Sequence, residues 1–203
     1  ILEYLTEEVL AQQPPAVQDF LLRTSVLDHL NGPLCDAVIQ GEGSRELLEI
    51  LVQRNLFVVP TGSPIPGDGS LYWFRYHPLF ADLLRGQMRQ QQPDLLPLLH
   101  QRAAEWYETH GAPEMAIEHA LEGADMARVA RLLEAHAGRI IMQGRIQTVT
   151  RWFQRLSEDR WQSLPRTNLA FAWALLMRGR YGEIEPYLQR AEPGIPDDAR
   201  ELH

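Results

Sequence analysis

The stretch from residue 72 to residue 85, which reads YWFRYHPLFADLLR, constrains the fold of this chain more than any other segment. Its first five residues are rich in aromatic side chains, which is typical of a β-strand. Pro78 suits the first turn of a helix, because the N–H that proline lacks has no partner there in any case. The apolar residues Leu79, Phe80, Leu83 and Leu84 then recur at helical spacing. We therefore expect a strand that passes directly into an amphipathic helix.

His77 occupies the junction between this strand and this helix. Backbone N–H groups and the positive end of the helix dipole meet at such a position, so it suits contact with an anion. The alternative is a strand-end histidine whose ring is hydrogen-bonded to the backbone. The sequence leaves both readings open.

The residues before this junction predict a small mixed domain over residues 1–92. Helices are expected at 1–12, 16–27, 34–39 and 44–55, and strands at 57–59 and 71–76. Asn31 and Ser44 are predicted helix caps. The glycines and prolines between the strands predict a hairpin with a long tip. Helices, a hairpin and a closing helix together form a winged-helix domain, in a chain that is mainly α.

Winged helices often read DNA with their third helix, here 44–55. That helix carries Arg45 and Arg54 against Glu46 and Glu49, so its charges cancel. The whole chain has a formal net charge of −8, whereas DNA-binding surfaces are normally basic. We therefore expect no direct DNA binding by this chain, and a winged helix that makes contacts within its own protein.

Residues 93–203 predict a helical array. Gly111, Gly144 and Gly179 are 33 and 35 residues apart, and each lies between two helical stretches. A period near 34 with glycine in the turn is typical of tetratricopeptide-like antiparallel helix pairs. An extra helix is expected at 125–136, after the first pair. The repeats are degenerate.

Five aromatic residues of the array have two possible roles. They are Trp106, Tyr107, Trp152, Trp161 and Trp173. Their faces suit stacking against a sugar, but buried aromatics at helical spacing more often fill a repeat core. The core interpretation is favoured for each of them.

Several chemistries are not expected in this chain. All 19 basic residues are arginine, so a P-loop lysine and a Schiff-base lysine are both excluded. The spacing of His100, His110 and His119 does not place them together on one helix face as a metal site. Cys35 stands alone among apolar residues, which favours a packing role and a reducing compartment. No apolar run approaches the roughly 18 residues of a membrane span. We expect neither catalysis nor a bound metal.

Four blocks of the sequence resemble the maltose-regulon activator family, and together with the first half of the chain the similarity extends over essentially its whole length. The blocks are WFRYHPLF, LHQRAAEWYETHG, AIEHAL and RYGEIEPYLQRAE. That family comprises cytoplasmic, ATP-dependent transcription activators of the STAND class with a LuxR-type DNA-binding domain. The resemblance implies that His77 contacts the β-phosphate of bound ADP in a closed resting state. It also implies that the helical array senses an inducer, possibly a sugar, and binds protein partners.

The resemblance predicts an internal piece of a longer regulator. ATP or ADP binding and DNA binding would then belong to other domains of the same protein, which are the expected partners of this chain. An inducer and self-association are expected for the full-length protein. The alternative is a stand-alone helical-repeat scaffold that binds another protein, and a P-loop upstream in the parent reading frame would decide between the two.

Overall fold

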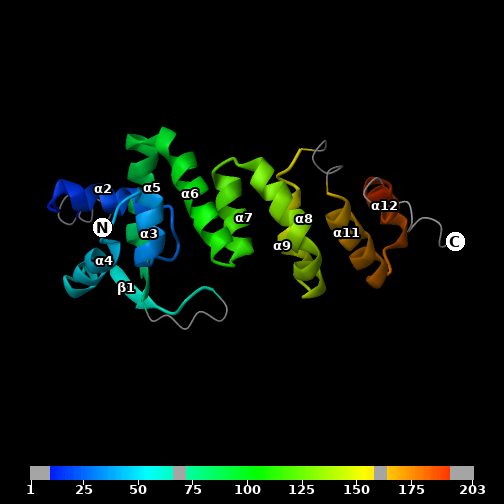
Figure 1. Cartoon of the computed structure of the whole chain (residues 1–203), viewed down its shortest axis with the longest axis horizontal. Coiled ribbons are helices and arrows are strands. Elements are labelled where there is room, and N and C mark those ends of the chain that lie inside the picture. The colour runs from blue at the N-terminus through cyan, green and yellow to red at the C-terminus, as the bar shows by residue number, and fades with distance from the viewer. Residues whose placement is uncertain (1–9, 66–71, 158–163, 193–203) are drawn as a thin grey trace. The chain divides into compact units, whose positions relative to one another are not determined.

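The computed structural model describes residues 10–65, 72–157 and 164–192. The chain divides into two compact units, Ile1–Gly123 and Ala124–His203, and each is described by itself. The described residues are mainly helical and contain one two-stranded sheet, which lies in the first unit (Figure 1). The expected helix at 1–12 lies almost entirely outside the described residues.

The first unit contains the elements of a winged helix followed by one helix pair. Its elements are α2 (Pro15–Thr24), α3 (Gly32–Ile39), α4 (Ser44–Gln53), β1 (Val58–Thr61), β2 (Trp73–Tyr76), α5 (Pro78–Gln91), the 3-10 turn η2 (Pro93–Leu95), α6 (Leu96–Thr109) and α7 (Pro113–Glu122). The predicted order of helices, hairpin and closing helix is confirmed, with bounds that differ by a few residues.

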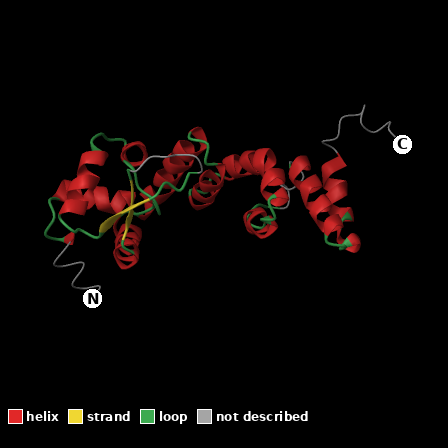
Figure 2. Cartoon of the chain, turned by 90° about the horizontal axis from the view of Figure 1, so that it is seen from below, coloured by secondary structure: helices red, strands yellow, loops and turns green. Residues whose placement is uncertain are grey.

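The hairpin is antiparallel and is extended by a third segment. Val58 pairs with Tyr76, and Thr61 pairs with Trp73. On the other edge of β2, the backbones of Leu30 and Phe74 exchange two hydrogen bonds of 2.8 Å each. The strand is therefore held on both sides, among the helices of the first unit (Figure 2). This fixes the direction in which the chain enters α5.

The two predicted helix caps have different outcomes. Asn31 caps α3, because its Oδ1 accepts a hydrogen bond of 2.7 Å from the Leu34 N–H. Ser44 does not cap α4: the N-cap is Gly43, whose φ of +82° is left-handed. The Ser44 N–H instead donates to Oδ1 of Asp36 at 3.0 Å, so a side chain from α3 serves the start of α4. The prediction for Ser44 was wrong, because Gly43 is the N-cap and the acceptor for the Ser44 N–H is a side chain of a neighbouring helix.

Large side chains from β2 and α5 fill the core of the first unit. Trp73, Phe80 and Leu84 are fully buried, and the Tyr76 hydroxyl lies 2.7 Å from Oγ1 of Thr24 in α2. Cys35 is also fully buried, as its apolar neighbours predicted, and burial raises the pKa of its thiol. Leu79 is an exception to the predicted apolar stripe of α5, since it remains 47% exposed.

Helix α6 packs against α3 of the winged helix. One contact between them is a hydrogen bond of 2.9 Å from Nη1 of Arg102 to the Val38 carbonyl oxygen. The division by compactness therefore falls after Gly123, whereas the predicted domain boundary between 92 and 93 marks the change from mixed to all-helical structure.

The second unit contains helices only, among the residues that the structure describes. They are α8 (Met126–Met142), α9 (Ile146–Phe153), α11 (Pro165–Met177), the 3-10 turn η3 (Tyr181–Glu183) and α12 (Glu185–Ala191). Helix α11 packs against both α8 and α12. The residues of the extra helix expected at 125–136 are helical, but the expectation of a separate helix was wrong, because they form the N-terminal part of α8.

The three repeated glycines end helices in the same way. Gly111, Gly144 and Gly179 have φ values of +72°, +82° and +70°. After α8, the Gly144 N–H bonds to the Ile141 carbonyl and the Arg145 N–H to the Ile140 carbonyl, which is a Schellman motif. The same two bonds follow α6 and α11. The prediction that these glycines mark turns between helices is confirmed.

No helix in the described part of the chain combines the length and apolar character needed to cross a membrane.

Candidate functional site

His77 lies at the junction that the sequence predicted, immediately before α5. Its backbone N–H donates to the Phe57 carbonyl oxygen at 2.7 Å. Its own carbonyl oxygen accepts from the N–H groups of Phe80 and Ala81, both at 2.9 Å. The backbone of His77 therefore joins the hairpin to the helix.

The imidazole of His77 takes no part in this backbone network. The residue is exposed, and its side chain does not cap α5. Its ring forms a T-shaped contact with the Phe57 ring, with centroids 6.3 Å apart. Within the described residues no hydrogen bond to the ring is present, so the ring is not the backbone-bonded one of the alternative reading.

The residues after His77 are also exposed. Pro78 and Leu79 both face solvent, and Phe80 is the first residue of α5 to be fully buried. Three consecutive exposed residues, His77, Pro78 and Leu79, therefore form a small surface at the N-terminus of α5. We call it the His77 corner. It offers an imidazole ring, an apolar side chain and the positive end of a 14-residue helix.

Helix α4, which corresponds to the DNA-reading helix of other winged helices, has few available cations. Nε of Arg45 lies 3.2 Å from Oε1 of Glu49, and its guanidinium lies 3.8 Å from the centre of the Tyr72 ring. Ile50 on the same helix is 42% exposed. This surface is neutral and partly apolar, unlike the basic surfaces that bind phosphate backbones.

The structure separates the aromatic residues of the array. Trp106, Tyr107 and Trp152 are buried, as the core interpretation predicted. Trp173 is 43% exposed, so for this residue the core prediction was wrong. Trp161 lies outside the described residues. Of the four described aromatics, only Trp173 therefore presents an accessible face.

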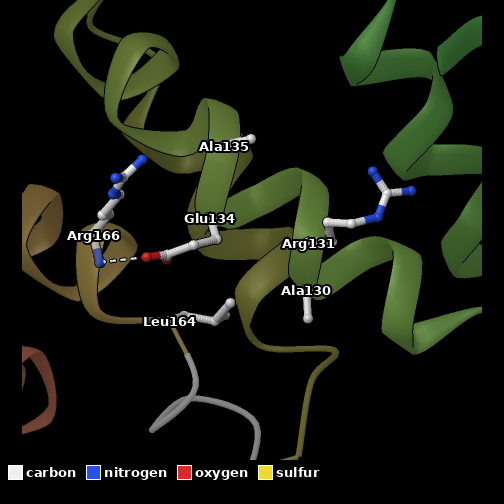
Figure 3. Close-up of a pocket in the computed structure, with 6 residues that line it drawn as sticks. All are labelled: Ala130, Arg131, Glu134, Ala135, Leu164 and Arg166. Carbon is white, nitrogen blue, oxygen red and sulfur yellow. Dashed lines mark hydrogen bonds between the residues drawn. The ribbon is translucent and has the colours of Figure 1, made fainter. Parts of the chain in front are cut away.

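An open pocket lies in the second unit, between α8 and the start of α11. It is lined by Ala130, Arg131, Glu134, Ala135, Leu164 and Arg166. Figure 3 shows that Arg131 reaches away from Glu134, whereas Arg166 lies on the other side of it. The two guanidinium groups do not converge, so the pocket lacks the paired cations of an anion site.

Glu134 in this pocket is already engaged. Its Oε1 accepts from the Arg166 N–H at 2.7 Å (Figure 3), and its Oε2 accepts from the N–H and the hydroxyl of Thr167 at 3.1 and 3.0 Å. A carboxylate at a helix N-terminus satisfies unpaired donors and favours the dipole. Glu134 therefore joins α8 to α11 as a cap, and this role explains its position without a ligand.

One cluster was missed by the sequence reasoning. His100 of α6 and His119 of α7 meet with their Nδ1 atoms 3.0 Å apart. Tyr107 stacks on His119, with centroids 5.4 Å apart. His100 precedes the Gly111 turn by 11 residues and His119 follows it by 8, so the hairpin brings the two rings to nearly the same level. The spacing of histidines within one helix does not predict this pair. The similar distances of His100 and His119 from the Gly111 turn would have predicted it.

Residues 6–96 match the family model of the MalT winged helix domain. The matched stretch contains α2 to α5, both strands and the His77 corner. It ends where α6 begins, so the helical array follows it. The chain thus joins a winged-helix domain similar to that of MalT to an array of helix pairs.

Proposed function

We propose that this chain is the regulatory core of an ATP-dependent transcription activator, in which the winged helix senses bound nucleotide and the helical array senses an inducer. The nucleotide-binding and DNA-binding domains belong to other parts of the same protein. The chain itself performs no catalysis, and its cofactor is ATP or ADP held by the neighbouring domain.

The observation that carries this proposal is the His77 corner within a MalT-like winged helix. The ring is exposed at the N-terminus of α5 and is not used to cap that helix. The backbone around it is fixed by three hydrogen bonds, to Phe57, Phe80 and Ala81. A fixed backbone with an unused ring suits a residue that contacts a ligand on another domain.

In this proposal an imidazole nitrogen of His77 donates a hydrogen bond to the β-phosphate of ADP. A charge-assisted hydrogen bond of this kind contributes about 1.5–3 kcal/mol. A contact made only in the ADP-bound state shifts the balance toward that state by roughly ten- to a hundredfold. His77 would therefore hold the activator in its resting form until ATP replaces ADP.

The array contributes the inducer-sensing part of the proposal. It consists of helix pairs whose turns share one geometry at Gly111, Gly144 and Gly179, as expected of tetratricopeptide-like repeats. Arrays of this kind bind ligands and proteins on extended surfaces. Trp173, which is 43% exposed, is accessible for contact with a sugar or a partner.

The test is a reporter assay in cells that lack inducer. We expect His77→Ala in the full-length protein to raise basal transcription, because the resting state loses its phosphate contact. Arg75→Ala is the matched control, since Arg75 is an exposed neighbour on β2 and has no assigned role. If the His77 variant shows unchanged basal transcription but a clearly lower melting temperature, His77 has a structural role only.

A second test uses the 203-residue chain alone. With no lysine and a net charge of −8, it should neither hydrolyse ATP nor bind duplex DNA at physiological salt. A gel shift with sub-micromolar affinity at about 150 mM salt would overturn the assignment of DNA binding to another domain.

A further inference from the structure

The pair formed by His100 and His119 is built from two helices that pack against each other. The ring centroids lie 5.2 Å apart and the Nδ1 atoms 3.0 Å apart. The nitrogens are therefore closer to each other than the ring centroids are, by 5.2 − 3.0 = 2.2 Å. This difference means that each ring points its Nδ1 toward the other ring. This is the geometry of an N–H···N hydrogen bond with one proton between the two atoms.

The same geometry argues against a metal ion between the rings. Zinc–nitrogen bonds measure about 2.0–2.1 Å, so an ion on the line between the two nitrogens would hold them about 4 Å apart. The observed separation of 3.0 Å is too short for that arrangement. Within the described residues, no group of three or more metal-ligating side chains is present either.

A shared proton sets a limit on how much charge the pair can carry. In the neutral pair, one ring donates its Nδ1–H and the other accepts with its Nδ1 lone pair. A first added proton binds the outer Nε2 of the donor ring and leaves the contact intact. A second added proton must bind the accepting Nδ1, which places two N–H groups and two positive charges against each other.

We propose that the contact between His100 and His119 is a proton-dependent lock between α6 and α7. It holds the two helices together while at most one of the rings is charged, and it opens when both are charged. Because α6 also packs on α3, opening would loosen α7 from a helix that is anchored on the winged-helix domain.

The surroundings of the pair support this behaviour. The charged groups that act on it are Glu122 of α7, Arg85 and Arg89 of α5, and Asp28 between α2 and α3. Arg85 is paired with Asp28, and the two remaining groups are one acid and one base. With charges of both signs present, burial is the largest influence and lowers the pKa of both rings. For His119 burial, together with the charge of His100, lowers the pKa to about 4.

The sign of the pH dependence follows from these shifts. A histidine whose pKa is lowered on folding stabilises the fold above its unfolded pKa of 6.5. That contribution is lost as the pH falls from about 6.5 toward the folded value. The lock is therefore closed at neutral pH and opens in acid.

The test compares urea unfolding of the 203-residue chain and two variants at pH 7.5 and 4.5. His119→Gln removes the titrating ring but keeps a hydrogen-bonding group. When the pH is lowered from 7.5 to 4.5, the equilibrium constant for folding of the wild-type chain should fall roughly 50- to 100-fold more than that of the variant. His110→Gln is the control: it replaces a histidine of the same helix pair whose ring bonds to the Trp106 carbonyl, and it should parallel the wild type.

Histidine ring NMR of the wild-type chain provides a measurement that needs no variant. We expect one of the two rings to carry its proton on Nδ1 and the other on Nε2 at neutral pH, and the last protonation to occur well below pH 6.5. Parallel unfolding curves for the wild type and His119→Gln would overturn the proposal. So would independent titration of both rings near pH 6.5, or a melting temperature raised by zinc through these two histidines.

Discussion

Helix α5 of the winged helix and helix α11 of the array are both rich in apolar residues, but they bury them differently. On α5 the residues Phe80, Leu84 and Met88 are fully buried. On α11 four apolar residues remain 43–63% exposed, namely Leu169, Trp173, Leu176 and Met177, while others on the same helix are buried. Helix α11 is thus apolar on both its inner and its outer side.

The difference reflects two ways of completing a core. The winged helix closes its core within one small domain, with β2 held on both sides and α5 packed on α2. In a repeat array each helix pair buries its apolar faces mainly against its neighbours in the stack. An apolar helix face that no neighbouring pair covers, such as the exposed side of α11, is then available for contact with another molecule. In the winged helix, exposed apolar side chains instead stand singly, such as Leu79 in the His77 corner and Ile50 on α4.

Two tryptophans give the strongest test of this contrast. Trp73 is fully buried and Trp173 is 43% exposed. We expect Trp73→Ala to destabilise the chain by about 3–5 kcal/mol, since it empties a core site. Trp173→Ala should cost less than about 1 kcal/mol, as expected for a surface position. Urea unfolding of both variants measures the difference, and equal losses would show that the array has a closed core as well.

Glu134 tests how the array holds its helices together. Glu134→Ala removes all three hydrogen bonds to the start of α11 and should destabilise the second unit by about 2 kcal/mol. Glu134→Gln keeps one acceptor oxygen and should lose roughly half as much. Helix content of the 203-residue chain during urea unfolding reports the loss. If neither substitution changes the stability of the second unit, the hydrogen bonds of Glu134 do not stabilise the array.

Two glycines should respond to alanine with opposite signs. Gly144 ends α8 with φ +82°, so Gly144→Ala is strained and should destabilise by about 1–2 kcal/mol. Gly86 lies inside α5 with ordinary helical backbone, and Gly86→Ala should stabilise by about 0.5–1 kcal/mol. No atom lies within 4 Å of a Cβ added at either position, so backbone preference alone decides the sign. Melting temperatures that shift in the same direction would contradict this.

The smallest expected effect concerns one buried hydroxyl of the winged helix. Oγ1 of Thr24 donates to the Phe20 carbonyl at 2.7 Å, so the Tyr76 hydroxyl is the donor in its own 2.7 Å bond to Thr24. Tyr76→Phe should therefore cost about 0.5–1.5 kcal/mol, because Thr24 keeps its own acceptor. Thr24→Val with and without Tyr76→Phe forms a double-mutant cycle. Additive losses would mean that the two hydroxyls do not interact in solution.

Features set by local sequence were predictable from the sequence alone. The turn glycines, the Asn31 cap and the passage from strand to helix at His77 depend on neighbouring residues. Features that depend on tertiary contacts were not. The start of α4 is served by Asp36 from another helix, and the pair of His100 and His119 forms only when the α6–α7 hairpin folds.

The exposure of single apolar residues was the least predictable property. Leu79 and Trp173 both occupy apolar helical stripes, yet each is more than two-fifths exposed. Periodicity indicates which side of a helix is apolar, but burial depends on whether another element covers that position. The position of His77 between strand and helix depends on local sequence and was predicted correctly. The exposure of His77 and its neighbours depends on tertiary packing and became visible only in the structure.

The most direct test of the proposed nucleotide contact is amide hydrogen exchange of the full-length protein with and without ADP. We expect slower exchange at the start of α5, at Leu79 to Ala81, when ADP is bound, and loss of that protection in His77→Ala. Amides of α8 and α9 should respond less, because the proposed nucleotide contact lies in the winged helix. Unchanged exchange around His77 at saturating ADP would show that His77 does not contact the nucleotide.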